Sequence, residues 1–298
     1  MDLNAILDEL TKLGVLDSAS TRPFPLPTGA SSVVLGVGRA DASSPEYVVK
    51  ANPRPDLIAA EATYLRAYAG APLLPRLHHL DPDGRYLVYA YVPGRVYLTP
   101  PFPGSRAAIL NRLARDLLSR YRPAVELAMA GTCGWLDDPV DPRLSWQHRF
   151  LASGLGQEWI GDRLPREDFE LVQDLAAASL QRGDEASRYL VHGDCGPYNF
   201  VFRGRTLAGV LDAAPVVGEP LFDLATAFTA WPGDFRLEAL RPALRALEQW
   251  QPRSERALVG DVLVVLYGQM VACLIFHPAD FARYLDAWTY WKGLLRNV

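Results

Sequence analysis

The stretch spanning residues 191–212, VHGDCGPYNFVFRGRTLAGVLD, restricts the possible folds of the chain more than any other. Its glycines and Pro197 predict a tight loop, because both residue types interrupt helices and strands. An apolar strand begins at Asn199, an Arg-Gly-Arg turn reverses it, and residues 207–211 return as a second strand. The predicted hairpin therefore ends at Asp212 and brings this acid back beside Asn199.

The polar side chains of this stretch suit the transfer of a γ-phosphoryl group. Such a transfer depends mostly on positioning and on neutralising charge on the phosphate oxygens. One carboxylate must orient the acceptor hydroxyl and take its proton, and Asp194 fits that requirement. A carboxylate and an amide oxygen must hold Mg²⁺, which prefers hard oxygen ligands, and Asp212 and Asn199 fit this second requirement.

The spacing of these residues carries a family resemblance. His192 precedes the first Asp by two positions, the Asn follows that Asp by five, and the second Asp lies thirteen further on, as in protein kinases. The chain resembles the aminoglycoside phosphotransferase/choline kinase-like family, whose catalytic loop reads His-Gly-Asp. The resemblance implies an ATP-dependent O-phosphotransferase with Asp194 as catalytic base and with Asn199 and Asp212 as Mg²⁺ ligands. It also implies that His192 and Asp223 support the loop.

The same resemblance implies an α+β, protein-kinase-like fold of two lobes. Residues 1–93 are expected to form a small β-rich N-lobe that covers the nucleotide, and residues 94–298 a larger, mainly helical C-lobe. In the N-lobe, the patterns predict helices over 2–16 and 55–68, a Pro-rich break over 22–27, and strands over 33–37, 47–51 and 85–92. In the C-lobe they predict helices over 106–127, 166–180, 221–230, 237–251, 254–276 and 280–296.

Lys50 ends a predicted apolar strand, in a chain whose other basic residues are almost all arginines. The chain has only three lysines, Lys12, Lys50 and Lys292, among 30 basic residues. A lysine on an apolar strand needs solvent or an anion, and the resemblance assigns Lys50 to the α- and β-phosphates of ATP. Glu61 lies on the apolar face of the next predicted helix, where a carboxylate needs a charged partner, and Lys50 is the natural one.

Two further segments resemble nucleotide-contacting parts of the family. The Thr-Gly-Ala-Ser-Ser stretch before the first long strand resembles a phosphate-covering loop, which assigns Gly29, Ser31 and Ser32 to the phosphates. An ordinary polar turn would have the same composition. Residues 87–94 resemble the family's hinge, and by position the resemblance assigns the carbonyl of Ala90 and the amide of Val92 to adenine. A plain strand followed by a turn would have the same sequence pattern.

The net charge and the cysteine content of the chain limit the kinds of partner and the cellular compartment that we expect. A net charge of −4 argues against a nucleic-acid-binding surface, which would be basic. Three cysteines without metal-type spacing indicate a reducing compartment, and the N-terminus shows no signal-peptide pattern, so we expect a cytoplasmic protein. Residues 257–276 are apolar but contain Asp261 and Gln269, which a membrane core would penalise. We therefore expect a buried helix and no membrane partner.

The expected partner is a small hydroxylated acceptor, such as an aminoglycoside, an amino alcohol or a sugar. In the family, the helices after the metal aspartate build the acceptor pocket. Acids and aromatic residues, which suit cations and sugars, occur there: Glu219, Trp231, Asp234, Tyr267, Asp280, Tyr284, Asp286 and Trp288.

Two other functions stay open. Asp212 is followed by Ala-Ala-Pro, where many relatives have an aromatic residue and then a further acid or glycine. This departure leaves a non-catalytic, pseudokinase-like nucleotide-binding scaffold as the alternative. A metal-dependent phosphoesterase is a third hypothesis, because a His-Gly-Asp cluster can ligate metals. It would need several His and Asp ligands, and of five histidines only His192 lies in such a motif.

Overall fold

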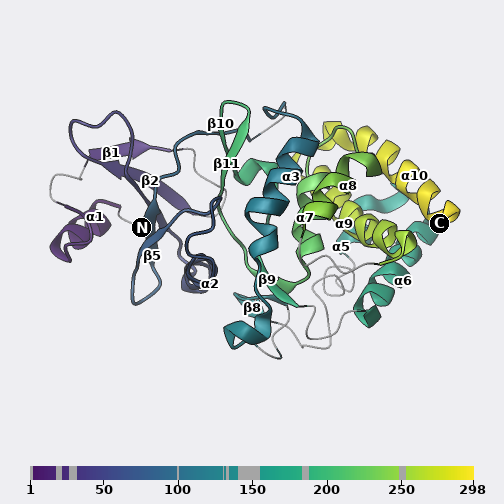
Figure 1. Cartoon of the computed structure of the whole chain (residues 1–298), viewed down its shortest axis with the longest axis horizontal. Helices are drawn as coiled ribbons and strands as arrows, with labels where there is room; N and C mark the ends of the chain where they lie inside the picture. The colour runs from purple at the N-terminus through teal and green to yellow at the C-terminus, as the bar shows by residue number, and fades with distance from the viewer. Residues whose placement is uncertain are drawn as a thin grey trace.

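The computed structural model describes residues 3–17, 22–26, 32–98, 101–129, 131, 134–139, 155–182, 188–247 and 253–298. Within these ranges, the longest strands lie toward the N-terminus and the longest helices toward the C-terminus. Figure 1 shows the result as two regions side by side, with a sheet and two helices on the left and a helical region on the right.

Five antiparallel strands form the N-terminal sheet in the order β1-β2-β3-β5-β4. Their bounds are Arg22–Pro25 (β1), Val33–Gly38 (β2), Tyr47–Ala51 (β3), Leu77–Leu80 (β4) and Tyr86–Ala90 (β5). β3 is central, and Lys50 pairs with Val34 of β2 and Leu87 of β5. Because side chains alternate along a strand, Lys50 shares a face with Val48 and lies opposite Val49.

A helix covers each face of this sheet. α1 (Leu3–Lys12) packs Leu10 into a small cluster with Val49. α2 (Pro55–Ala67) covers the other face and joins the main core of the protein, which also contains Val48. The face that carries the Lys50 side chain is therefore the face that meets α2.

The helical region is built around α9 (Glu255–Phe276), which packs against α5, α6, α7 and α10. The other helices are α3 (Arg106–Asp116), α5 (Leu155–Ile160), α6 (Arg166–Arg182), α7 (Pro220–Thr229), α8 (Leu237–Ala246) and α10 (Phe281–Asn297). By length and composition alone α9 could cross a membrane, but 72% of its most apolar window is buried in the protein. It has the burial of a core helix, as expected from Asp261 and Gln269 in its sequence.

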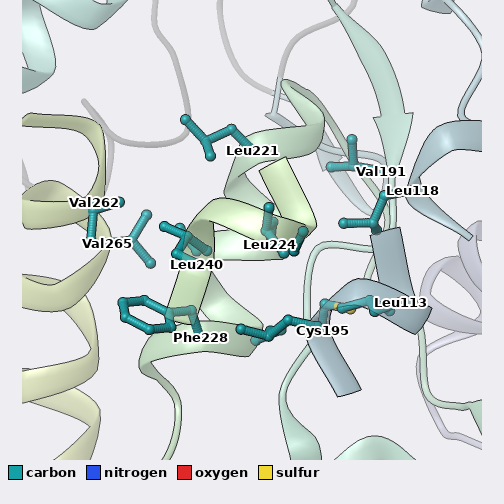
Figure 2. Close-up of a cluster of buried hydrophobic side chains, with 14 of the residues drawn as sticks. Leu113, Leu118, Val191, Cys195, Leu221, Leu224, Phe228, Leu240, Val262 and Val265 are labelled. Atoms are coloured by element: carbon teal, nitrogen blue, oxygen red, sulfur yellow. The ribbon is translucent and has the colours of Figure 1, made fainter. Parts of the chain in front are cut away.

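Figure 2 shows part of this core, in which Val262 and Val265 of α9 lie toward Phe228 of α7 and Leu240 of α8. The same cluster includes Cys195, which is fully buried beside the predicted catalytic loop. Burial raises the pKa of its thiol well above the usual value, so Cys195 serves as a small core residue.

Two small sheets connect the regions and hold the segment singled out in the sequence. β6 (Arg95–Val96), β10 (Phe200–Arg203) and β11 (Thr206–Val210) form one, with β10 in the middle. β7 (Gly134–Trp135), β8 (Asp138–Pro139), β9 (Tyr189–Val191) and β12 (Val216–Gly218) form the other, in the order β8-β7-β12-β9. The loop after β9 and the loop before β12 are thus held together, because Val191 pairs with Val216.

Several elements differ from the sequence-based expectation, among them β4, which was not predicted, and α8, which ends at Ala246. The helix predicted over 106–127 ends at Asp116 and continues as the short 3₁₀ turns Leu118–Arg120 and Ala124–Leu127. The residue before proline, here Arg122, disfavours helical geometry, so no single helix can run through to residue 127. The first helix ends at Lys12, and Gly14 follows in a left-handed conformation. The Pro-rich break over 22–27 contains β1, an edge strand, where proline is tolerated.

Candidate active site

A cavity of about 510 Å³ lies between the N-terminal sheet and the β10–β11 hairpin. That volume lies within the range of small-molecule sites. Val34 and Val48 line it from the sheet, and Val201 and Leu211 from the hairpin and the residue after it. Residues distant in sequence meet in this cavity, and its polar side chains come from Ser32, Lys50, Tyr89, Tyr91, Arg95, Tyr198, Asn199 and Asp212.

Lys50 is a buried cation of this cavity. Its Nζ donates to Glu61 Oε2 at 2.5 Å and also to Asp212 Oδ1. The side chains of Lys50 and Glu61 are 7% and 5% exposed, whereas that of Asp212 is 46% exposed. Burial opposes the charge on Lys50, but the two carboxylates outweigh it and raise the pKa of the ammonium group. Lys50 therefore stays charged between two carboxylates.

Helix α2 connects this ion pair to the predicted catalytic loop. Glu61 and Tyr64 are three residues apart and so share a face of the helix. The Tyr64 ring meets the His192 ring edge to face, with centroids 5.5 Å apart. The Tyr64 hydroxyl donates to that of Tyr121 at 3.3 Å. One face of α2 thus contacts both Lys50, the candidate phosphate-binding residue, and His192 of the predicted catalytic loop.

Asp194 is held by donors on both carboxylate oxygens. The Tyr198 hydroxyl donates to Oδ1 at 2.5 Å, and Asn199 Nδ2 donates to Oδ2 and to the Asp194 carbonyl, both at 2.9 Å. Burial raises the pKa of the Asp194 carboxyl, while these two hydrogen bonds oppose the rise. Tyr198 and Asn199 line the cavity, and Asp194 lies against both without lining it.

The oxygens next to Asp194 suit Mg²⁺. Leu211 N–H donates to the Asn199 carbonyl at 2.9 Å, which brings Asp212 beside Asn199. Because Asn199 Nδ2 is committed to Asp194, its Oδ1 is the atom left to face a cation. Mg²⁺ in phosphate sites takes one or two protein oxygens besides phosphate and water, and this donor set fits. Within the described ranges no three His, Cys, Asp or Glu residues cluster as a phosphoesterase metal site would require.

Asp212 adopts a left-handed backbone conformation, with φ of +60°. Among the described residues other than glycine, only Ala128 shares a positive φ. Such a conformation costs an L-residue about 1–2 kcal/mol, and Asn and Asp adopt it most readily. Residues held in this way concentrate at functional sites, because the surrounding structure must compensate for the cost.

His192 is buried and neutral. Its Nε2 lies 3.1 Å from the Leu211 carbonyl, and its Nδ1 accepts from the Asp194 N–H at 3.3 Å, so the proton sits on Nε2. Burial lowers the pKa of His192 to about 4. Its ring therefore contacts the loop from inside and ties it to the segment before Asp212, and its role in supporting the loop stays a prediction.

Asp223, in the first turn of α7, accepts hydrogen bonds from the loop backbone. Its Oδ2 accepts from His192 N–H at 2.7 Å and from the Tyr121 hydroxyl at 2.6 Å, and its Oδ1 accepts from Gly193 N–H at 2.9 Å. The side chain is fully buried, and burial raises its pKa to about 6. Asp223 thus fixes the two residues that precede Asp194.

Gly193 cannot be replaced without moving the loop. Its φ is +82°, and an added Cβ would lie 1.8 Å from the Ala214 carbonyl oxygen. Gly204 has φ of +60° but nothing within 4 Å of an added Cβ, so it is a matched control. We expect Gly193→Ala to cost about 3 kcal/mol of unfolding free energy and Gly204→Ala about 1 kcal/mol. Urea unfolding measures both, and equal losses would contradict the close approach to Ala214.

The buried histidine makes folding stability depend on pH. Its pKa is about 4 in the folded protein and about 6.5 unfolded, so the folded state binds fewer protons between those values. Acidification from pH 7 to 5 therefore removes about 2 kcal/mol through His192. Asp223, with its pKa raised to about 6, opposes this, because the folded state binds more protons below pH 6.

A His192→Asn variant separates the two contributions. It lacks the titrating ring and keeps Asp223, so its stability deficit relative to the natural protein should shrink by about 2 kcal/mol from pH 7 to pH 5. Urea titrations of both proteins at the two pH values measure this. A deficit that stays constant would show that His192 titrates normally in the folded protein.

The remaining predicted nucleotide residues divide into three groups. Ser32 and Val92 line the cavity, and Ser32 Oγ accepts from Asn52 Nδ2 at 3.0 Å. Ala90 ends β5, its N–H donates to the Arg76 carbonyl at 2.9 Å, and it does not line the cavity. The predicted phosphate-covering residues Gly29 and Ser31 lie outside the described residues.

Sequence reasoning missed two tyrosines at this site. Tyr198 directly contacts the predicted base, and Tyr121 donates to Asp223 from the segment between two 3₁₀ turns. An aromatic residue immediately before Asn199 was the available signal for Tyr198. Tyr121 carries no local signal, because its contact spans about one hundred residues of sequence.

Comparisons with known proteins show the family and the fold of the chain. The profile of the phosphotransferase enzyme family matches residues 25–258. No curated protein sequence matches the chain. Many solved structures share its fold, and three of them illustrate the range of these proteins. A predicted fructosamine-3-kinase from Thermobifida fusca YX-ER1 is 21% identical, with a TM-score of 0.61 and 99% of each chain covered.

The second similar structure is a choline/ethanolamine kinase family protein from Mesorhizobium loti, with 18% identity, a TM-score of 0.59, and 99% of this chain and 95% of that chain covered. The third is an aminoglycoside 2″-phosphotransferase in a ternary complex with streptomycin and ATP, with 17% identity, a TM-score of 0.60, and 97% and 99% covered. The predicted family and the α+β, protein-kinase-like fold are thereby confirmed. The chain belongs to the phosphotransferase enzyme family, as a small-molecule phosphotransferase with a sheet-rich region beside a helical one.

Proposed function

We propose that the protein moves the γ-phosphoryl group of Mg·ATP to a hydroxyl of a small molecule such as an aminoglycoside, an amino alcohol or a sugar. One observation carries the proposal. Lys50, Asn199 and Asp212 line a single cavity, and Asp194 is hydrogen-bonded to Asn199 at its border. A phosphoryl-transfer site needs a cation for the phosphates, oxygen ligands for a metal and a carboxylate for the acceptor, and these four residues supply that set.

Each side chain has a defined task in this proposal. The apolar walls of the cavity hold the adenine, with backbone groups of Ala90 and Val92 at its edge. Lys50, kept charged and held by Glu61, binds phosphate oxygens. Asn199 and Asp212 hold Mg²⁺, which neutralises charge on the phosphates when bound. Gly29, Ser31 and Ser32 cover the phosphates, and His192 and Asp223 support the loop.

Asp194 acts on the acceptor. Its carboxylate accepts a hydrogen bond from the acceptor hydroxyl, orients that oxygen toward the γ-phosphorus and takes the proton. The bond between the acceptor oxygen and the γ-phosphorus forms, and the bond from that phosphorus to the bridging oxygen breaks. ADP and a phosphate monoester leave. The orientation of Asp194 by Asn199 suits this task, because general bases work only in the correct geometry.

We also propose the lobe boundary and the compartment. The division between residues 93 and 94 is supported by β6, which follows at once and pairs with β10 rather than with the N-terminal sheet. A cytoplasmic location is supported by the burial of the thiols of Cys195 and Cys273, which form no disulfide in the described part of the chain.

A screen for phosphoryl acceptors tests the proposal. Purified protein is incubated with Mg²⁺ and γ-labelled ATP and, separately, aminoglycosides, choline, ethanolamine, fructosamines and simple sugars. Transfer of label to one acceptor class supports the proposal and names the substrate. The competing scaffold hypothesis, motivated by the Ala-Ala-Pro sequence after Asp212, predicts nucleotide binding without transfer to any acceptor.

A further inference from the structure

We infer that Tyr198 is a positioning residue that caps the catalytic base and keeps water from acting as the phosphoryl acceptor. The inference rests on the proposed function and adds a specificity device to it. Its starting point is the hydrogen bond from the Tyr198 hydroxyl to Asp194 Oδ1, at 2.5 Å. The Tyr198 hydroxyl donates a hydrogen bond to the carboxylate of Asp194, as the acceptor hydroxyl must do during transfer.

Tyr198 lies between the base and the nucleotide cavity. It belongs to the short 3₁₀ turn Pro197–Asn199, and both Tyr198 and Asn199 line the cavity while Asp194 does not. Asn199 engages the other carboxylate oxygen, Oδ2, at 2.9 Å. Each oxygen of Asp194 therefore already accepts a hydrogen bond from a protein side chain on the cavity side.

Gly196 fixes the position of the tyrosine ring. A Cβ added at Gly196 would lie 2.3 Å from Tyr198 Cζ and 2.7 Å from its hydroxyl oxygen. Real Cβ atoms do not approach other atoms so closely, so the ring occupies the space that a side chain at 196 would need. The glycine thus allows the hydroxyl to reach Asp194.

An acceptor has to displace this cap. The Tyr198 hydroxyl occupies Asp194 Oδ1, so an acceptor hydroxyl must replace it there before its proton can pass to the carboxylate. Burial raises the pKa of the Tyr198 hydroxyl, and Asp194 raises it further, so the phenol keeps the proton that it donates to Asp194.

Without the cap, water can take the place of the acceptor. A water molecule donates to Asp194 Oδ1, its oxygen bonds to the γ-phosphorus of ATP, and the bond from that phosphorus to the bridging oxygen breaks. The proton goes to Asp194, and ADP and inorganic phosphate leave. The tyrosine hydroxyl blocks this route by holding the oxygen that would activate the water.

Acceptor-free hydrolysis of Mg·ATP tests the inference. Tyr198→Phe removes the hydroxyl and keeps the ring, so ADP release without acceptor should rise about tenfold, the factor that corresponds to one hydrogen bond. Gly196→Ala, which displaces the ring, should also raise it. Tyr97→Phe is the control, because Tyr97 packs its ring on Phe202 and lies outside the cavity lining. Adding Asp194→Asn to Tyr198→Phe should abolish the gain.

A second readout separates this inference from the proposed function. Affinity for a non-hydrolysable ATP analogue, measured by titration calorimetry, should be unchanged in Tyr198→Phe. If the natural protein binds the analogue with Mg²⁺ but Tyr198→Phe hydrolyses ATP no faster, the capping role is wrong and the proposed function stands. If no form of the protein binds the analogue, the proposed function itself fails.

Discussion

Replacing Asp194 by asparagine is expected to lower phosphoryl transfer about a thousandfold, while Mg·ATP affinity stays within about twofold. The size follows from the usual contribution of a general base, roughly 10²–10⁴ in rate. The loop should keep its shape, because the new amide can accept from Asn199 through its oxygen and donate to the Tyr198 hydroxyl through its nitrogen. Steady-state turnover and analogue titration measure the two effects.

A carboxylate away from the cavity provides the control for this substitution. Asp174 lies on the exposed side of α6, so Asp174→Asn removes one charge at the surface only. Its turnover should equal that of the natural protein. A fully active Asp194→Asn enzyme would show that another group accepts the proton.

Replacing Asp212 by asparagine is expected to remove the contribution of Mg²⁺ to nucleotide affinity, a loss of about a hundredfold, or roughly 2.7 kcal/mol. Asparagine tolerates the left-handed backbone at this position, so the fold should be kept. Lys50 keeps Glu61 as its partner, and the like charges of Glu61 and Asp212 no longer share one cation. Thermal stability should therefore stay the same or rise.

The measurement is analogue binding with and without Mg²⁺. The natural protein should bind more tightly with the ion, and Asp212→Asn should bind equally in both conditions. Asp212→Ala adds the cost of a left-handed alanine, about 1–2 kcal/mol, and should be less stable than Asp212→Asn. If Mg²⁺ still strengthens binding to Asp212→Asn, the metal is held elsewhere.

Local patterns predicted much of this site. The hairpin over β10 and β11 follows from an apolar strand, a glycine turn and a second apolar strand, and it places Asp212 beside Asn199 as expected. The apolar face of α2 likewise required a charged partner for Glu61, and the structure places Lys50 Nζ 2.5 Å away. These contacts join residues that are close in sequence or share a strong periodic pattern.

Two direct contacts between distant segments were not predicted. Lys50 meets Asp212 across 162 positions, and Tyr121 meets Asp223 across 102, with no periodic signal at either end. The four-stranded sheet that holds the loop uses strands of two or three residues, too short for an alternating pattern to be visible. An interruption of the helix predicted over 106–127 could have been predicted from Pro123, because the residue preceding a proline disfavours helical geometry.

The most direct test of the central claim is a crystal structure of the protein with Mn²⁺ and a non-hydrolysable ATP analogue. We expect the phosphates at Lys50, the anomalous signal of the metal between Asn199 and Asp212, and the terminal phosphate on the side of the loop that carries Asp194. A nucleotide bound outside this cavity, or a metal held by other residues, would contradict the account.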